Sequence, residues 1–564
     1  MKIKKYFVFL IIILASFIAS RDLFKPGYFP MHDDLQTGRL YEMELCFRDG
    51  QIPCRWSPDM GFSYGYPLFN YYPPFPYYLG MVFRLLGVSA IGSIKILFIL
   101  GFFLSAVFMF ILGKELWGEI GGLVASIFYL FSPYHAVDIY VRGAMNEFWA
   151  LTWFPLIFWA VLKIVKGKDN KFVPLLALSY GLLLLTHNVM TMLFTPLVVV
   201  WGILLIWSEK KKWQEKIFRL AVGGVWGIGI AAFFILPVIF EGKFVHTETM
   251  LMGYFNYLAH FVGLKKTLFT RFWGYGSSGW LQEAGMPFQV GFPQWPVATV
   301  VFLLCLFLFL KKKLKLGNFL IYGYLYFIFL FSLFMVHARS VFIWDRLPFL
   351  SYVQFPWRFL ALTMFGMSVV SGGVIKLVKE RRRQIILGVL LIVLTILLNY
   401  SFFRPEKIVQ VTDEEKLFSA KGWKKLQTDG IFDYLPKYAQ YPPGGPAPQM
   451  PEIKIGKTET SEIKKGTNWY VFKARVIEQS KIQIPLYDFP GWKVWTNGKL
   501  AEIKHDNLLG LITINLSPGD YLVKAKLTDT PVRIMGNFIS LVSLLILFWS
   551  VFKVFKKSRV SVFK

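Results

Sequence analysis

The sequence predicts a polytopic α-helical membrane protein of about twelve transmembrane helices, with a C-terminal extracytoplasmic β-sandwich domain that a final transmembrane helix tethers. The chain has 564 residues, of which 55% are hydrophobic, and its mean hydropathy is +0.49. A soluble fold cannot bury that much apolar surface. The apolar residues form long runs separated by short basic clusters, whereas 402–533 is polar and alternates as strands do.

The charge of the chain is strongly positive, at +28 from 62 Lys and Arg against 34 Asp and Glu. A nucleic-acid partner would suit that balance, but the cations lie in short clusters between apolar runs. Such clusters are typical of membrane topology and of contact with anionic lipids. We therefore expect the lipid bilayer as a partner and no nucleic acid.

The first apolar run, 6–19, follows the basic residues Met1–Lys5. A cleaved signal peptide would look similar, but the many runs that follow favour an uncleaved first helix. Most runs approach the ~20 residues that a bilayer requires. The remaining runs are 92–113, 119–137, 147–164, 172–186, 189–207, 216–240, 296–310, 317–336, 357–378, 384–401 and 534–555.

The basic clusters orient these helices in the plasma membrane. With Met1–Lys5 in the cytoplasm, the connections that return to that side are 113–118, 163–171, 208–216, 311–315, 376–383 and 553–564. All but the first are strongly basic, as cytoplasmic connections are. We therefore expect both termini in the cytoplasm, and the long loops and the active site on the extracytoplasmic side.

The chain divides into three parts on this pattern. A transmembrane module covers 1–401, with a first outer loop at 21–84 and a long outer loop at 241–295. A β-rich domain covers 402–533, where Asn497-Gly498 and 517–520 are turn signals between alternating segments. The final helix and a basic tail occupy 534–564.

The cysteines leave one question open. Cys46 and Cys54 lie in the first outer loop, where an oxidising compartment would allow a disulfide, but a free pair fits the sequence equally well.

The first outer loop carries the residues best suited to chemistry. Asp33 and Asp34 follow the first span closely, and a carboxylate there can accept a proton from a sugar hydroxyl or hold a divalent cation. The same pair could instead cap a helix that starts near Leu35. The stretch 64–78, with Tyr71 and Tyr72, supplies flat faces for sugars and polyprenyl chains, or else an interfacial aromatic belt.

Further candidates lie in the other outer loops. Arg142 can bind a lipid phosphate or pair with Glu147 as a structural ion pair, and Asp138 lies in the same loop. His187, at the end of a short span, is either a ligand or a structural residue.

The other two candidates are arginines. Arg271 lies in the long loop 241–295, which resembles an interfacial segment or lid, and Arg358 opens another span from outside. No phosphate-binding loop of the form G-x-x-x-x-G-K-[ST] occurs in the sequence. A membrane-delivered, phosphate-activated sugar is therefore the natural donor for an outward-facing site.

These motifs occur in a consistent order along nearly the whole chain. They are His32-Asp33-Asp34, GYPLFNYY at 65–72, VRGAMNE at 141–147, LLLTHN at 183–188, QFPWR at 354–358 and FPGWKVWTNG at 489–498. As a set they resemble the GT-C superfamily of membrane glycosyltransferases. More narrowly, the chain is similar to YfhO-type proteins and to the membrane family labelled "6-pyruvoyl-tetrahydropterin synthase-related", a label that nothing here connects to pterin chemistry.

The resemblance implies an inverting transfer from a polyprenyl-phosphate sugar to an extracytoplasmic acceptor: a cell-envelope glycan, a lipid or a protein. Asp33 or Asp34 would be the general base, with Asp33 slightly preferred, and Arg142, Arg358 or Arg271 would bind the phosphate. The β-rich domain would help to hold the acceptor. The other residues expected to bind substrate are His32, Tyr71, Tyr72, Asp138, Glu147 and His187. Dependence on a divalent cation, Mg²⁺ or Mn²⁺ at Asp33 and Asp34, stays open.

Two other classes of protein remain as alternatives. A flippase or transporter of lipid-linked sugars predicts charged or broken helices near the bilayer midplane, which the sequence does not show. A non-catalytic scaffold for envelope assembly predicts that replacing Asp33 or Asp34 by Asn has no effect.

Overall fold

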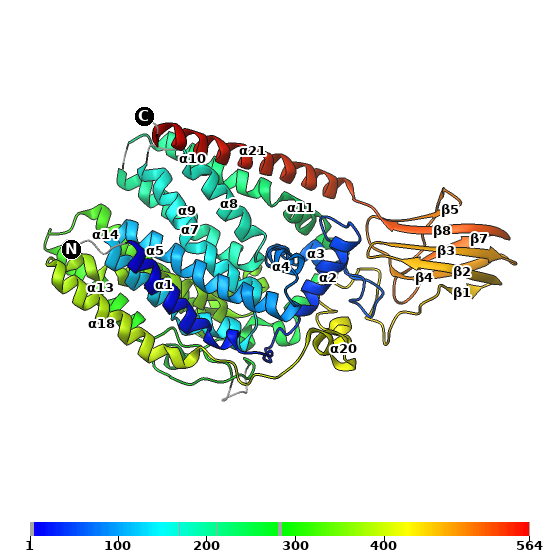
Figure 1. Ribbon diagram of the computed structural model, residues 1–564, viewed down its shortest axis with the longest axis horizontal. Coiled ribbons are helices and arrows are strands. Elements are labelled where there is room, and N and C mark those ends of the chain that lie inside the picture. Colours follow the sequence, from blue (N-terminus) through cyan, green and yellow to red (C-terminus); the bar gives the residue numbers. More distant parts are fainter. Residues whose placement is uncertain (1–4, 168–169, 210, 280–284, 563–564) are drawn as a thin grey trace.

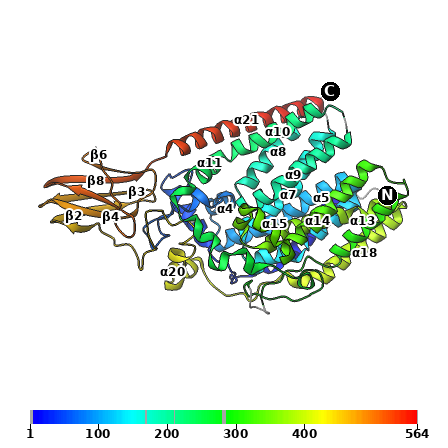
Figure 2. The ribbon, with the colours of Figure 1, turned by 180° about the vertical axis from the view of Figure 1, so that it is seen from behind.

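The computed structural model describes residues 5–167, 170–209, 211–279 and 285–562. Its larger part is a bundle of long helices, and a β-sheet domain projects from one end of that bundle (Figure 1). The start of α1 and the end of α21 both lie at the opposite end of the bundle, apart from each other, as the reverse view also shows (Figure 2).

The helices have the following bounds. The first half of the chain contains α1 (Lys5–Ser20), α2 (Gln36–Arg48), α3 (Leu68–Tyr71), α4 (Phe75–Leu85), α5 (Ala90–Leu130), α6 (Pro133–Ala136), α7 (Met145–Lys166), α8 (Phe172–Leu184), α9 (Asn188–Glu209), α10 (Trp213–Ile230), α11 (Ala232–Glu241) and α12 (Leu264–Leu268). The second half contains α13 (Gln294–Leu310), α14 (Leu316–Val336), α15 (Val341–Arg346), α16 (Leu360–Gly372), α17 (Val374–Leu377), α18 (Arg381–Asn399), α19 (Asp413–Phe418), α20 (Ala420–Thr428) and α21 (Pro531–Val562).

The chain is a polytopic helical membrane protein, but the predicted number of about twelve spans is not confirmed. Among the described residues, eight helices are long and apolar enough to cross a membrane, or nine if the bent pair formed by α10 and α11 counts as one span. The predicted runs at 172–186 and 296–310 form α8 and α13, whose 13 and 17 residues are shorter than an independent span needs. The predicted run at 216–240 breaks between α10 and α11, which meet at 76°.

The two predicted runs at 92–113 and 119–137 fall mostly in α5, which is a hairpin. Gly118 has a φ of +83°, a left-handed conformation that reverses the chain at that point. The Ser126 hydroxyl donates to the Ala106 carbonyl at 2.7 Å, so the two legs lie side by side. A Cβ on Gly113 would come within 2.9 Å of the Gly122 Cα, which shows how closely the small residues let the backbones approach.

The β-sheet domain contains two antiparallel sheets. One has the order β1-β4-β7 and the other β2-β3-β8-β5-β6. Apolar residues from both sheets, among them Phe472, Ile484 and Val523, share one buried core. The strands are β1 (Glu452–Ile455), β2 (Thr458–Lys465), β3 (Trp469–Val476), β4 (Ser480–Tyr487), β5 (Trp492–Thr496), β6 (Lys499–Ala501), β7 (Leu511–Leu516) and β8 (Gly519–Leu527).

A layer of loops and short helices joins the bundle to the β-sheet domain. It contains α2, α3, α4 and the segment 402–451, where α19 and α20 lie (Figure 1). In the first of these loops, Cys46 and Cys54 form a disulfide. The strands therefore occupy only the later part of 402–533, and the earlier part packs against the loop that carries Asp33 and Asp34.

Candidate active site

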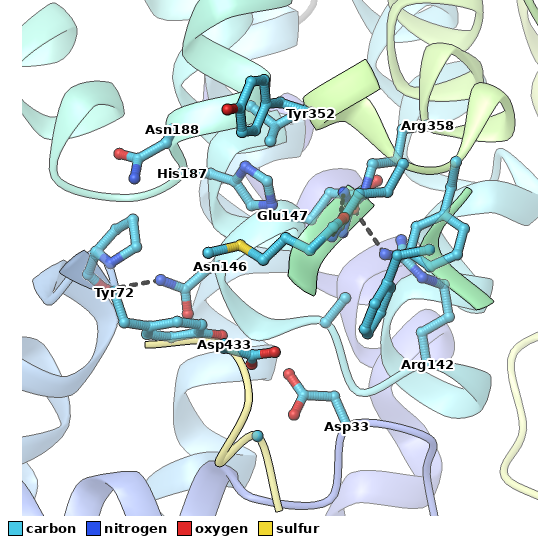
Figure 3. Close-up of a pocket in the computed structure, with 18 of the residues that line it drawn as sticks. Asp33, Tyr72, Arg142, Asn146, Glu147, His187, Asn188, Tyr352, Arg358 and Asp433 are labelled. Carbon is cyan, nitrogen blue, oxygen red and sulfur yellow. Dashed lines mark hydrogen bonds and ion pairs between the residues drawn. The ribbon is translucent and has the colours of Figure 1, made fainter. Parts of the chain in front are cut away.

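A cavity of about 890 Å³ opens within this layer of loops. The first loop, the connection that precedes α7, the start of α9, the long loop after α11 and the segment before β1 all contribute to its lining. Figure 3 shows its residues, with Arg142 and Arg358 on one side and Asp33 and Asp433 on another. The lining includes nine of the predicted site residues, which are His32, Asp33, Asp34, Tyr71, Tyr72, Arg142, Glu147, His187 and Arg358.

Backbone pairing brings two of the predicted loops together. The His32 N–H donates to the Val141 carbonyl at 3.0 Å, and the Asp33 N–H donates to the Arg142 carbonyl at 2.8 Å. Residues 31–33 and 141–143 therefore move as one unit, which places a carboxylate and a guanidinium in the same cavity.

Asp33 is the more accessible of the two adjacent carboxylates, with its side chain 35% exposed. Its Oδ2 pairs with Nη1 of Arg39 at 2.8 Å and accepts a hydrogen bond from Gln36 at 3.0 Å. Arg39 is buried and lies over the ring of Tyr72, 4.3 Å from the centroid. Asp33 therefore presents a partly exposed carboxylate to the cavity, and a carboxylate can accept a proton as a general base does.

Asp34 is held by the segment before the β-sheet domain. Its Oδ2 pairs with Nζ of Lys416 at 2.5 Å and lies 3.9 Å from Nζ of Lys425, and its side chain is 14% exposed. Burial raises the pKa of the Asp34 carboxyl, and Lys416 opposes that effect. Asp34 thus ties α19 and α20 to the first loop.

Arginines and carboxylates alternate on the opposite wall. Arg142 pairs with Asp138 at 2.5 Å and with Glu147 at 2.7 Å, and Glu147 lies 3.3 Å from Nε of Arg358. The Arg142 guanidinium also lies over the ring of Trp357, 4.5 Å from the centroid. Arg142 therefore forms the predicted ion pair with Glu147 and also lines the cavity, whereas its binding of a lipid phosphate stays a prediction.

Arg358 keeps part of its guanidinium available. Its Nη1 donates to the Val353 carbonyl at 2.8 Å and to Gln354 at 3.1 Å. The described residues supply no hydrogen-bond acceptor to its Nη2. A phosphate oxygen in the cavity can accept from that group.

The remaining predicted residues in the lining are anchored by backbone groups. His187 accepts the Met190 N–H on Nδ1 at 3.1 Å, and His32 donates from Nε2 to the Tyr275 carbonyl at 2.9 Å. Burial lowers the pKa of His32, which keeps it neutral. The Tyr71 hydroxyl donates to the Glu241 carbonyl at 2.7 Å.

Two predicted site residues do not line the cavity. Asp138 is fully buried behind Arg142 and acts on the cavity only through that arginine. Arg271 lies elsewhere, because its Nη2 donates to the Leu398 carbonyl at 2.5 Å and its guanidinium covers the ring of Phe402. The long loop contributes other residues to the lining, among them Thr247 and Tyr254.

The sequence did not indicate Asp433, Asn146 or Arg39. Asp433 belongs to the lining, and its carboxylate points towards that of Asp33 on the same side of the cavity (Figure 3). Burial raises its pKa to about 6. Asn146 donates to the carbonyls of Pro73, at 2.7 Å, and Thr186, at 2.9 Å, and so joins three loops. Asn146 lies within the VRGAMNE motif, whereas no sequence signal distinguishes Asp433 from other loop carboxylates.

The described residues do not form a metal site of the usual kind. They contain no group of three or more His, Cys, Asp or Glu side chains that could hold a metal ion. Asp33 and Asp34 instead pair with Arg39 and Lys416. Because both carboxylates already pair with cationic side chains, they do not fit a site for Mg²⁺ or Mn²⁺, on which dependence was left open from the sequence, and no step below depends on a metal.

Fold and site together define a polytopic helical membrane protein with a polar, arginine- and carboxylate-lined cavity beside a C-terminal β-sheet domain. The chain belongs to the membrane protein family described as "6-pyruvoyl-tetrahydropterin synthase related domain", whose model matches residues 69–404. It is 26% identical over 322 residues to an uncharacterized protein of Lactococcus lactis subsp. cremoris, a match that covers 54% of this chain and 50% of that relative. The chain thus spans about half the length of this curated relative.

Solved structures with a similar course of the chain include two membrane enzymes. Arabinofuranosyltransferase AftD from Mycobacteria matches with a TM-score of 0.46 and 12% identity, over 73% of this chain and 28% of AftD. The oligosaccharyltransferase of Archaeoglobus fulgidus matches with a TM-score of 0.39 and 13% identity, over 71% of this chain and 55% of that enzyme.

Proposed function

We propose that the chain is a membrane glycosyltransferase that moves a sugar from a polyprenyl-phosphate donor to an extracytoplasmic acceptor, with inversion at the anomeric carbon. The observation that carries the proposal is that one cavity is lined by both a carboxylate and guanidinium groups. An accessible carboxylate, Asp33, lies on one wall, and two guanidinium groups, Arg142 and Arg358, lie on another. The carboxylate can accept the proton of an acceptor hydroxyl, and the guanidinium groups can bind a phosphate leaving group.

In the proposed reaction the acceptor hydroxyl oxygen attacks the anomeric carbon while Asp33 takes the hydroxyl proton. The bond between that carbon and the phosphate oxygen breaks, and the electron pair stays on the polyprenyl phosphate. Arg358 and Arg142 stabilise the charge that develops there, because guanidinium groups bind phosphate oxygens in a bidentate way. Asp33 is preferred to Asp34 as the base, since Asp34 is less exposed and pairs with Lys416.

The donor class follows from the proposed sidedness. If the basic connections face the cytoplasm, the cavity lies on the outer side, where nucleotide sugars are not made. The Cys46–Cys54 disulfide supports that placement, because disulfides persist in oxidising compartments. The tyrosines of the lining, Tyr71 and Tyr72, can stack on a sugar ring, and the β-sheet domain can hold the acceptor.

The test is turnover by the purified full-length chain in lipid nanodiscs with a panel of polyprenyl-phosphate sugars, scored as release of polyprenyl phosphate. Asp33→Asn should abolish release, whereas Asp520→Asn, an exposed residue of the β-sheet domain, should not. Movement of intact lipid-linked sugar across a bilayer without release would indicate the flippase instead. Equal release by wild type and Asp33→Asn would exclude the catalytic assignment.

A further inference from the structure

The five-stranded sheet has one covered face and one open face. Along β3, Tyr470, Phe472 and Ala474 point into the domain core, so the alternate residues point outward. On β8 the outward residues are Leu522, Lys524 and Lys526, all exposed. No described segment covers them. The strands run away from the bundle along the long axis of the molecule (Figure 1), so this face looks sideways and not back towards the helices.

The register places cations and indole rings beside one another on this open face. Lys526 of β8 lies between Trp469 of β3 and Lys493 of β5. Two residues earlier on β8, Lys524 lies between Val471 of β3 and Trp495 of β5. We call the surface formed by Trp469, Val471, Lys493, Trp495, Lys524 and Lys526 the sheet patch.

The charges of the sheet patch are not neutralised within the chain. Lys493, Lys524 and Lys526 form no ion pair with any residue that the structure describes. Lys493 lies directly opposite Lys526, and like charges in that position destabilise a sheet. Lys526 interacts electrostatically with Asp49 without forming an ion pair, and Asp49 accepts from Trp469 Nε1 at 3.1 Å and from the Thr467 hydroxyl at 2.8 Å.

Away from the sheet patch, charged residues of the same sheet lie opposite, or form ion pairs with, residues of opposite charge. At the far end of β3 and β8, Arg475 lies opposite Asp520. Lys473 pairs with Glu462 of β2 at 2.6 Å. The uncompensated lysines are therefore confined to the half of the face that also carries the two tryptophans.

We infer that the sheet patch binds an anionic glycan, a polymer in which sugar rings carry phosphate or carboxylate groups. Lysine ammonium groups attract the anions, and half-exposed indole rings give sugar rings a flat surface to cover. Charge complementarity and the mixture of cations with aromatic faces favour this partner over a bare lipid surface. The inference does not depend on the proposed transferase reaction.

The experiment measures binding of the full-length protein, in nanodiscs of zwitterionic lipid, to phosphomannan and to unphosphorylated mannan. Phosphomannan should bind more tightly, and its affinity should fall as salt rises, since screening weakens exposed charge pairs. The triple variant K493Q/K524Q/K526Q should lose about tenfold or more in affinity for phosphomannan. A matched triple, K454Q/K457Q/K504Q, removes three exposed lysines outside the patch and should bind as wild type does.

A second variant, Trp495→Ala, keeps every charge and should weaken phosphomannan binding by several-fold, so the inference stays testable if the triple variant fails to fold. Equal affinity for mannan and phosphomannan would overturn the inference, as would unchanged binding in both variants. Anionic vesicles or RNA that bind through the same three lysines at least as tightly as phosphomannan would also overturn it, in favour of a membrane or a nucleic acid.

Discussion

The hydroxyl of Tyr66 donates to the carbonyl of Gly430 at 2.7 Å, although 364 residues separate them in the chain. The same hydroxyl accepts the Tyr434 N–H at 2.6 Å. Tyr66 thus fixes both ends of the turn 430–434 against the first loop, and Asp433 lies within that turn. This contact is the reason that a carboxylate from the segment before the β-sheet domain faces Asp33 in the cavity.

Asp433 should make stability depend on pH. Its pKa is raised to about 6 by burial, so the folded chain holds this proton more tightly than the unfolded chain does. The contribution is complete below pH ~4 and is lost as pH rises through 6, with a size on the order of 3 kcal/mol. Thermal unfolding between pH 4.5 and 7.5 should show this loss in wild type and not in Asp433→Asn. Asp429→Asn, in the same segment, should behave as wild type; identical profiles for Asp433→Asn and wild type would contradict the assignment.

The two adjacent aspartates should respond differently to substitution. Asp33→Asn removes the proposed base and should reduce kcat by about a hundredfold or more, with little loss of folded protein. Asp34→Asn weakens the contact with Lys416 and should lower thermal stability, with a smaller effect on kcat. Turnover and unfolding temperature, measured on the same preparations, separate the two effects. The reverse pattern would assign the base to Asp34.

The apolar runs and basic clusters were sufficient to predict a polytopic membrane protein and the helical nature of each run. The turn at Gly118 lies within the connection predicted at 113–118, whereas the break after Ile230, which bends the run predicted at 216–240, was not predicted. Within the site, most of the predicted residues belong to the motifs that follow one another along the sequence, and these motifs meet in one cavity. Asp433 was not, because its position depends on the Tyr66 contact, which no local pattern records.

The arginines of the cavity should control donor binding. Arg358→Lys keeps the charge but loses the planar guanidinium fork, and should raise KM for the polyprenyl-phosphate sugar by about tenfold, as should Arg142→Lys. Arg271→Lys is the matched control, because Arg271 does not line the cavity and should leave KM unchanged. Initial rates over a range of donor concentrations give KM for the wild type and for each variant. A KM effect at Arg271 equal to that at Arg358 would show that the response is not specific to the cavity.

The junction between the bundle and the last helix should depend on one buried ion pair. Arg533 is fully buried; its Nε donates to Glu241 Oε2 at 2.9 Å, and its Nη2 lies 2.9 Å from the same oxygen as an ion pair. Glu241 also accepts from Asn70, in the motif that supplies Tyr71 and Tyr72 to the cavity. Arg533→Met leaves a buried carboxylate without its partner and should cost about 3–5 kcal/mol.

Thermal unfolding, followed by tryptophan fluorescence at a fixed detergent concentration, measures this cost. Replacing Glu241 by Gln in the Arg533→Met background removes the unpaired charge, and should recover part of the lost stability because the remaining side chains can be neutral. Arg382→Met, at an exposed position in the first turn of α18, should have almost no effect. If Arg533→Met unfolds at the same temperature as Arg382→Met, the buried pair does not hold the junction, and the last helix must be held by its other contacts, among them the hydrogen bond from Arg55 to Asn537.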